Sequence, residues 1–319
     1  MIKIVYLATP EIAVPALDFL SNRDDIECCA VVTKIDKPQG RGQKITPPPV
    51  KVCAVKNNLR VFQPKLIRND TELISFLKEQ KPDFFITFAY GQILSKEILD
   101  IPKYGTINLH ASLLPKYRGA NPIQCAIVNG ETKTGITTML TVEELDAGDI
   151  CKCQEIEISK DMNDEELREK IAALSPELIY KTICEIYEGK LKFISQNSDE
   201  ATFSCKYCKQ DGEIDWTTSA EEIHNRIRGL CSFPGCFGYI GNKMVKILAS
   251  KVSEQKTTAE PGSFLGKNKE GLDFAAGSGT VLTLLKVKPE GKKEMSAKDW
   301  FNGAQLKTGD KFERTGAAE

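Results

Sequence analysis

The chain contains only two histidines, and one of them, His110, lies two residues after Asn108. The run from Gly105 to His110 reads as a strand within the alternation of strands and helices along the chain. Side chains two apart on a strand point to the same face, so a carboxamide and an imidazole should project together. Imidazole transfers protons near neutral pH, which makes His110 the candidate for acid–base chemistry. The other histidine, His224, falls inside a helical pattern and is expected to be a surface or packing residue.

A carboxylate that could serve this pair follows in the run Leu145-Asp146-Ala147-Gly148-Asp149. Asp and Gly are turn-forming residues, so the run is typical of a surface turn. The same turn could instead return the carboxylate of Asp146 to orient an imidazole. The spacing alone does not decide between these two interpretations.

Eleven cysteines are scattered through the chain, which is typical of a protein in a reducing compartment rather than of a disulfide framework. Two pairs could be combined into a four-thiolate zinc site, but packing is the favoured interpretation and we predict no metal. These pairs are Cys205 with Cys208, and Cys231 with Cys236.

Nucleotide-binding fingerprints are missing from the sequence. The turn after the first expected strand reads Leu7-Ala8-Thr9-Pro10-Glu11, without the G-x-G-x-x-G pattern of dinucleotide-binding enzymes. No phosphate-binding P-loop occurs either. These observations argue against an NAD-dependent dehydrogenase and against an ATPase.

The elements that must position Asn108 and His110 alternate between strands and helices. Such alternation predicts an α/β fold with a Rossmann-like, mostly parallel sheet and helices on both faces, with function at the carboxyl ends of the strands. A first helix should start with Thr9 as its N-cap and Pro10 at its first position. Strands are expected at Ile2–Leu7, Cys28–Thr33, Val61–Gln63, Asp83–Phe88, Gly105–His110 and Ile136–Thr141, and helices at Asn69–Gln80 and Ile123–Asn129.

The alternation stops near residue 190, and the polar run Ser195–Thr202 resembles a linker. One helix, Ser219–Leu230, precedes several short strand-like runs separated by Gly and Pro, which predicts a small β-barrel (OB-like). Those runs are Tyr239–Ile240, Met244–Ala249, Gly262–Phe264 and Thr280–Val287. We therefore expect a catalytic domain at 1–189, a linker at 190–206 and a C-terminal β-barrel domain at 207–319.

The charge and hydropathy of the chain exclude some classes of protein. Its formal net charge of −1 excludes a uniformly basic nucleic-acid coat protein, although a local basic patch remains open. The segment Lys34–Lys51 is such a patch: it contains Arg41 and Lys44 among glycines and prolines, and could be a solvated loop or an arm that grips phosphates. No apolar run reaches 18 residues and the start is a poor secretory signal, so we expect a cytoplasmic protein without a membrane partner.

The run NLHASLLPKYRGANPI, followed by LDAGD, resembles the signature of the folate-dependent formyltransferases. Four further runs are similar to the members of that family that act on methionyl-tRNA: ATPEIAVPAL, FAYGQILSKEIL, RGQKITPPPVK and GKKEMSAKDW. The resemblance covers nearly the whole chain. One departure is Ala8, where the family often has Gly.

The resemblance implies a role for each residue of the signature. Asn108 should donate a hydrogen bond to the formyl oxygen, His110 should transfer the proton, and Asp146 should orient His110. The folate pocket should be lined by Ser112, Leu113, Leu114 and Pro115, with Tyr90 and Gly91 beside the pterin.

The substrates implied are 10-formyltetrahydrofolate as the formyl donor and initiator methionyl-tRNA as the acceptor, without a metal or an obligate protein partner. Arg41 and Lys44 should bind the tRNA. Two alternatives remain at this point: a related enzyme that formylates a small-molecule amine, and a non-catalytic tRNA-binding protein on the same fold.

Overall fold

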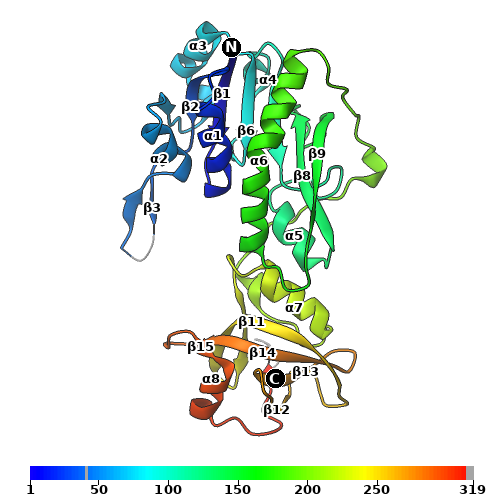
Figure 1. Cartoon of the computed structure of the whole chain (residues 1–319). Helices are drawn as coiled ribbons and strands as arrows, with labels where there is room; N and C mark the ends of the chain where they lie inside the picture. Colours follow the sequence, from blue (N-terminus) through cyan, green and yellow to red (C-terminus); the bar gives the residue numbers. More distant parts are fainter. Residues whose placement is uncertain (40–41, 314–319) are drawn as a thin grey trace. The chain divides into compact units, whose positions relative to one another are not determined.

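The computed structural model describes residues 1–39 and 42–313, and it divides into two compact units (Figure 1). The first unit comprises Met1–Pro122, Lys133–Glu157 and Arg168–Ser204. The second comprises Ile123–Thr132, Ile158–Leu167 and Cys205–Glu319. Two short segments thus belong to the second unit although they come before residue 189, a feature that a linear reading of the sequence could not anticipate.

A seven-stranded sheet forms the centre of the first unit, in the order β5-β2-β1-β6-β7-β8-β9. The first five strands run parallel, and β8 and β9 are added antiparallel at the far edge. The predicted mostly parallel α/β sheet is therefore confirmed. Its strands are β1 (Ile2–Ala8), β2 (Ile26–Val32), β5 (Val61–Phe62), β6 (Phe84–Phe88), β7 (Thr106–His110), β8 (Lys133–Leu140) and β9 (Ile150–Glu157).

Helices cover both faces of this sheet because β1 is apolar on both faces. Val5 and Leu7 pack in one cluster with helix α3, whereas the Tyr6 hydroxyl points the other way and donates to the Ala13 carbonyl at 2.8 Å. The helices are η1 (Glu11–Ala13), α1 (Val14–Ser21), α2 (Pro49–Lys56), η2 (Ile67–Asn69), α3 (Thr71–Gln80), α4 (Lys96–Leu99), η3 (Ser198–Glu200) and most of α6 (Asp164–Tyr187).

The predicted start of the first helix was wrong. Pro10, not Thr9, stands at the N-cap position of η1, and the Thr9 hydroxyl donates to the Tyr90 carbonyl at 3.1 Å. Thr9 therefore joins the ends of β1 and β6 instead of capping a helix.

The described residues of the basic segment Lys34–Lys51 include two short paired strands that its composition does not predict. Strands β3 (Lys37–Gln39) and β4 (Lys44–Thr46) pair as an antiparallel hairpin, which Figure 1 shows reaching out from the first unit. At its base, the Lys51 ammonium lies 2.8 Å from an Asp36 carboxylate oxygen. Pro49, the last of three consecutive prolines, starts helix α2, because proline is well tolerated in the first turn of a helix.

The second unit contains an antiparallel sheet in the order β12-β13-β14-β11-β10-β16. The sheet curls until its edges meet, since the Phe264 N–H donates to the Asp310 carbonyl at 2.7 Å and Ser263 bridges Lys311. The predicted barrel-like C-terminal fold is confirmed in this form. Its strands are β10 (Cys236–Ile240), β11 (Lys243–Lys256), β12 (Phe264–Lys267), β13 (Leu272–Ala276), β14 (Thr280–Pro289), β15 (Met295–Ser296), which pairs with β14, and β16 (Phe312–Glu313).

The core of the second unit is aromatic. The rings of Trp216 and Phe312 stack with centroids 4.8 Å apart, and Phe274 packs against both. The helices of this unit are α5 (Pro122–Val128, from its second residue on), η4 (Gln210–Gly212), α7 (Ala220–Gly229) and α8 (Ala297–Ala304).

His224 lies on α7 and is a buried packing residue, which is one of the two roles expected for it. Its Nδ1 atom lies 3.0 Å from the Ser250 hydroxyl and its Nε2 atom 3.2 Å from the Lys160 carbonyl. Burial lowers the pKa of His224 below that of a free histidine. Among the described residues, every helix is too short or too polar to cross a membrane.

Candidate active site

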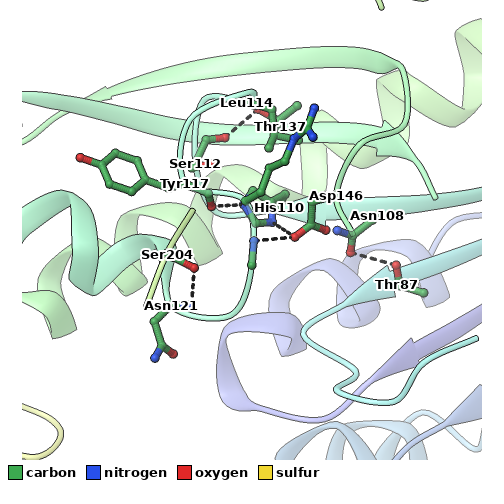
Figure 2. A network of polar contacts seen from close by, with 12 residues as sticks. Thr87, Asn108, His110, Ser112, Leu114, Tyr117, Asn121, Thr137, Asp146 and Ser204 are labelled. Atoms are coloured by element: carbon green, nitrogen blue, oxygen red, sulfur yellow. Dashed lines mark hydrogen bonds and ion pairs between the residues drawn. The ribbon is translucent and has the colours of Figure 1, made fainter. Parts of the chain in front are cut away.

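Asn108 and His110 lie at the carboxyl end of β7, and Asp146 comes close to them from the loop between β8 and β9 (Figure 2). The Asn108 Oδ1 atom accepts a 2.9 Å hydrogen bond from the Thr87 hydroxyl on the neighbouring strand. No other hydrogen bond of this side chain occurs within residues 1–39 and 42–313. Both hydrogens of the Asn108 Nδ2 group are therefore available to a ligand.

His110 is buried, and its two ring nitrogens have different neighbours. The Nε2 atom lies 2.9 Å from the Tyr117 carbonyl oxygen, whereas the Nδ1 atom lies 3.6 Å from Asp146 Oδ2. A carbonyl oxygen only accepts, so Nε2 must carry a hydrogen. Proton transfer by His110 is thus left to Nδ1, the nitrogen that faces the carboxylate.

The Asp146 carboxylate is held by the backbone of the loop after β7. Its Oδ2 atom accepts a 2.8 Å hydrogen bond from the Gly119 N–H. Asp146 itself has a φ of +50°, a left-handed conformation that Asp tolerates better than most residues. Gly148 packs so tightly that a Cβ atom there would overlap the Leu140 carbonyl oxygen.

The predicted folate loop is held mainly by its own contacts and by Thr137 on β8. Ser112 is fully buried and its hydroxyl donates to the Lys116 carbonyl at 2.6 Å, while Thr137 donates to the Ser112 carbonyl at 2.7 Å. The Leu114 N–H donates to the Thr137 hydroxyl at 3.3 Å. Ser112 therefore shapes the loop from inside, and Leu113 and Pro115 are the more accessible members of the predicted set.

Tyr90 and Gly91 follow β6, at the same end of the sheet. The Tyr90 ring packs in the core and burial raises its pKa, while its hydroxyl has no partner within the described part of the chain. Gly91 has a φ of +74° and is exposed, and the Lys34 ammonium occupies the place where a side chain would stand. These two residues can offer a ligand their backbone rather than their side chains.

Comparison with known proteins settles what kind of protein carries this arrangement. The profile of the formyl transferase family matches residues 2–183, and that of the formyl transferase C-terminal domain matches residues 206–305. A methionyl-tRNA formyltransferase of Clostridium acetobutylicum is 43% identical over 309 residues, which cover 97% of this chain and 99% of that protein.

This chain belongs to the formyltransferase family.

Two further similarities agree with this assignment. A methionyl-tRNA formyltransferase of Bacillus subtilis is 41% identical over 310 residues, which cover 97% of each chain. An N-formyltransferase of Helicobacter canadensis, solved in complex with folinic acid and dTDP-3-aminofucose, superposes with a TM-score of 0.66. That structure covers 89% of this chain and is 21% identical, so it supports the fold alone.

Of the two residues expected to bind tRNA in this formyltransferase, the structure describes Lys44. Lys44 is exposed at the start of β4. Arg41 lies outside the residues that the structure describes. Both assignments stay predictions.

Two residues that support the site, Thr87 and Gln196, carry no signal in the sequence. Thr87 orients Asn108, and Arg118 and Gln196 hydrogen-bond to each other beside the Asp146 loop. Thr202, in the run expected to be a linker, accepts from the Arg118 N–H at 2.8 Å, and its hydroxyl accepts from the Tyr117 N–H at 2.9 Å. Gln196 and Thr202 therefore tie this run to the loop after β7.

The cysteine pairs do not assemble into a metal centre in the described part of the chain. No group of three or more His, Cys, Asp or Glu residues there has the geometry to hold an ion. Cys236 is buried in the core of the second unit, where burial raises its pKa to about 12. Cys205 instead approaches Cys125, with 3.6 Å between their Sγ atoms.

Proposed function

We propose that this formyltransferase transfers the formyl group of 10-formyltetrahydrofolate to the amino group of methionine esterified to initiator tRNA. The main observation in support is that Asn108, His110 and Asp146 lie together at the carboxyl end of β7. The proposal is further supported by relatives with 41–43% identity over the whole chain that bear the name methionyl-tRNA formyltransferase.

In the proposed reaction, the amine nitrogen attacks the formyl carbon and the carbonyl oxygen becomes an oxyanion. Asn108 stabilises this charge through its Nδ2 hydrogens, whose direction is fixed because Thr87 holds the other end of the amide. A donor fixed before the reaction begins is usually the largest single contribution in acyl transfer.

His110 moves the proton. The attacking amine becomes an ammonium and must lose a proton, and the leaving N10 nitrogen must gain one when its bond to the formyl carbon breaks. The Nδ1 atom of His110 accepts the first proton and returns it to N10, because Nε2 is held by the Tyr117 carbonyl. Asp146, 3.6 Å from Nδ1, stabilises the imidazolium formed in between.

The folate is proposed to lie between the Tyr90–Gly91 backbone and the loop of Ser112, Leu113, Leu114 and Pro115. The exposed Gly91 backbone and the accessible Leu113 suit a flat ring system that needs close approach.

The tRNA is proposed to contact Arg41 and Lys44 of the basic segment Lys34–Lys51. It is also proposed to contact lysines of the second unit, such as Lys243, Lys246, Lys251, Lys292 and Lys293. Lysine and arginine neutralise phosphates and release counterions, which supplies affinity without sequence readout. We place the reaction in the cytoplasm, where charged tRNA and reduced folate are available.

One assay tests the function. Purified protein is incubated with 10-formyltetrahydrofolate and either methionyl-tRNA, an amino sugar nucleotide or a glycinamide nucleotide, and the formylated product is measured. The expected result is turnover with methionyl-tRNA that is lost in Asn108→Asp. Turnover only with a small amine would replace the proposed acceptor, and no turnover with any acceptor would contradict the proposed reaction.

A further inference from the structure

The side-chain amide of Gln196 joins two loops of the active site. Its Oε1 atom accepts from Arg118 Nε at 3.1 Å and from Arg118 Nη2 at 2.9 Å. Its Nε2 group donates to the Asp146 carbonyl at 2.8 Å and to the Gly148 carbonyl at 2.7 Å. The amide thus uses its acceptor toward one loop and both of its hydrogens toward the other.

Arg118 transmits this contact to the catalytic histidine. Its side chain is almost completely buried, and the residue stands in the sequence directly between two backbone groups that serve the site. The Tyr117 carbonyl, which precedes it, accepts a hydrogen bond from His110 Nε2. The Gly119 N–H, which follows it, donates to the Asp146 carboxylate. Fixing the Arg118 guanidinium therefore limits the movement of both groups.

The Asp146 loop needs a hold of this kind. Asp146 has a φ of +50°, which costs a non-glycine residue free energy relative to ordinary backbone. Its neighbours Leu145 and Glu144 are exposed, so this side of the turn is held by polar contacts, among them the 3.6 Å ion pair between Glu144 and Arg118 Nη1. The two hydrogen bonds from Gln196 reach the carbonyls on either side of Ala147 and close the turn across its ends.

We propose that Gln196 is a positioning residue for formyl transfer, which fixes the Asp146 carboxylate opposite His110 by clamping the Asp146 turn to Arg118. The proposal rests on the proposed function, in which Asp146 acts on His110. It assigns a role to a segment that the sequence presents as a polar linker.

Position 196 needs a side chain that both accepts and donates hydrogen bonds, as an amide does. A variant that keeps only the acceptor can therefore separate a positioning role from a structural one. Glutamate at 196 keeps an acceptor, now charged, for the buried Arg118, but it offers no hydrogen to the Asp146 and Gly148 carbonyls. If Gln196 served only as a hydrogen-bond acceptor for Arg118, Gln196→Glu would keep that contact and keep turnover. If it positions the turn, Gln196→Glu must impair turnover.

The experiment compares kcat and KM of Gln196→Glu with those of the unchanged protein, in the methionyl-tRNA assay. The expected result is a fall in kcat of about ten-fold or more, with KM for methionyl-tRNA changed less than about two-fold. Asn57→Asp is the matched control, because Asn57 is also a half-buried amide that donates to Asp18 Oδ1 and to the Cys53 carbonyl. That variant is expected to lower the melting temperature and leave kcat unchanged.

A double-mutant cycle shows whether Gln196 acts through Asp146. Gln196→Glu is introduced into Asp146→Asn, and single-turnover rates are measured at saturating enzyme. The proposal predicts that Gln196→Glu has little further effect in that background, because the carboxylate that it positions is gone. Additive losses, or an unchanged kcat of Gln196→Glu, would overturn it. An inactive unchanged protein, by contrast, would count against the proposed function itself.

Discussion

The Thr87 hydroxyl donates a 2.9 Å hydrogen bond to Asn108 Oδ1, and this contact between neighbouring strands β6 and β7 sets the direction of the Asn108 amide. With the oxygen held, the direction of the Nδ2 hydrogens is set as well. A donor whose direction is set by the scaffold needs no reorganisation when an oxyanion forms, which is the condition for strong electrostatic stabilisation.

Asn108→Asp tests this donor with a side chain of the same shape. The carboxylate can still accept from Thr87, but it offers no hydrogen and brings a negative charge to the developing oxyanion. Loss of one oxyanion donor costs about 2.7–4 kcal/mol of barrier, so we expect kcat to fall about 10²- to 10³-fold or more. Asn108→Ala should lose about as much while folding normally, as thermal melting would check. Near-normal turnover in either variant would contradict the role of Asn108.

Gly148→Ala tests whether the Asp146 turn must stay closed. A Cβ atom at 148 overlaps the Leu140 carbonyl, so the turn has to move and take Asp146 with it. We expect kcat to fall about ten-fold or more and stability to fall by about 1–3 kcal/mol, as measured by turnover and by urea unfolding. Gly303→Ala is the matched control, since Gly303 lies in helix α8 with no atom near its missing side chain. If Gly148→Ala keeps full turnover and stability, the exact position of the Asp146 turn does not matter for the reaction.

The strand that carries the site could be predicted because its signal is local. Gly105–His110 reads as a strand, and a spacing of two is enough to place Asn108 and His110 on one face. The position of Asp146 could not be predicted in this way, because a left-handed turn closed by Gly119 and Gln196 depends on contacts across 27 and 50 residues of sequence. The same residues could have formed a surface turn.

Helix α6 shows a second limit. Its 24 residues include Pro176, which usually ends a helix, and no strand-helix alternation marks its start. The helix is held by contacts with distant residues, such as the 2.9 Å contact between the hydroxyls of Thr182 and Thr138 on β8. Gln196 was missed for a related reason: its partner Arg118 is 78 residues away, and its neighbours in sequence are polar.

Arg41→Ala tests the basic hairpin. If Arg41 contacts a tRNA phosphate, its loss should raise KM for methionyl-tRNA and reduce the slope of log affinity against log salt by about 0.7–0.9. Lys56→Ala is a charge-matched control, because Lys56 is exposed at the end of α2 and outside the hairpin. The measurement is KM for methionyl-tRNA over a series of salt concentrations. An unchanged slope in Arg41→Ala would remove Arg41 from the tRNA interface.

His224 should make the stability of the protein depend on pH. Desolvation lowers the pKa of this buried histidine in the folded state, with Arg228 acting in the same direction and Asp161 opposing it. Below the unfolded value of 6.5, the unfolded chain therefore binds a proton that the folded chain resists. Stability should fall as the pH drops below that value, by at most about 1.4 kcal/mol per pH unit, and His224 should contribute nothing above it.

The measurement for His224 is urea unfolding between pH 5 and 7.5, followed by tryptophan fluorescence, because Trp216 and Trp300 are both buried in the same unit. His224→Asn removes the titrating group and can still hydrogen-bond to Ser250, so its unfolding free energy should vary less with pH than that of the unchanged protein. His110→Asn is the control, because it removes the other histidine and should leave the pH dependence of the second unit's stability unchanged. If His224→Asn keeps the full dependence below pH 6.5, another group must cause it, and the buried position of His224 has no effect on acid stability.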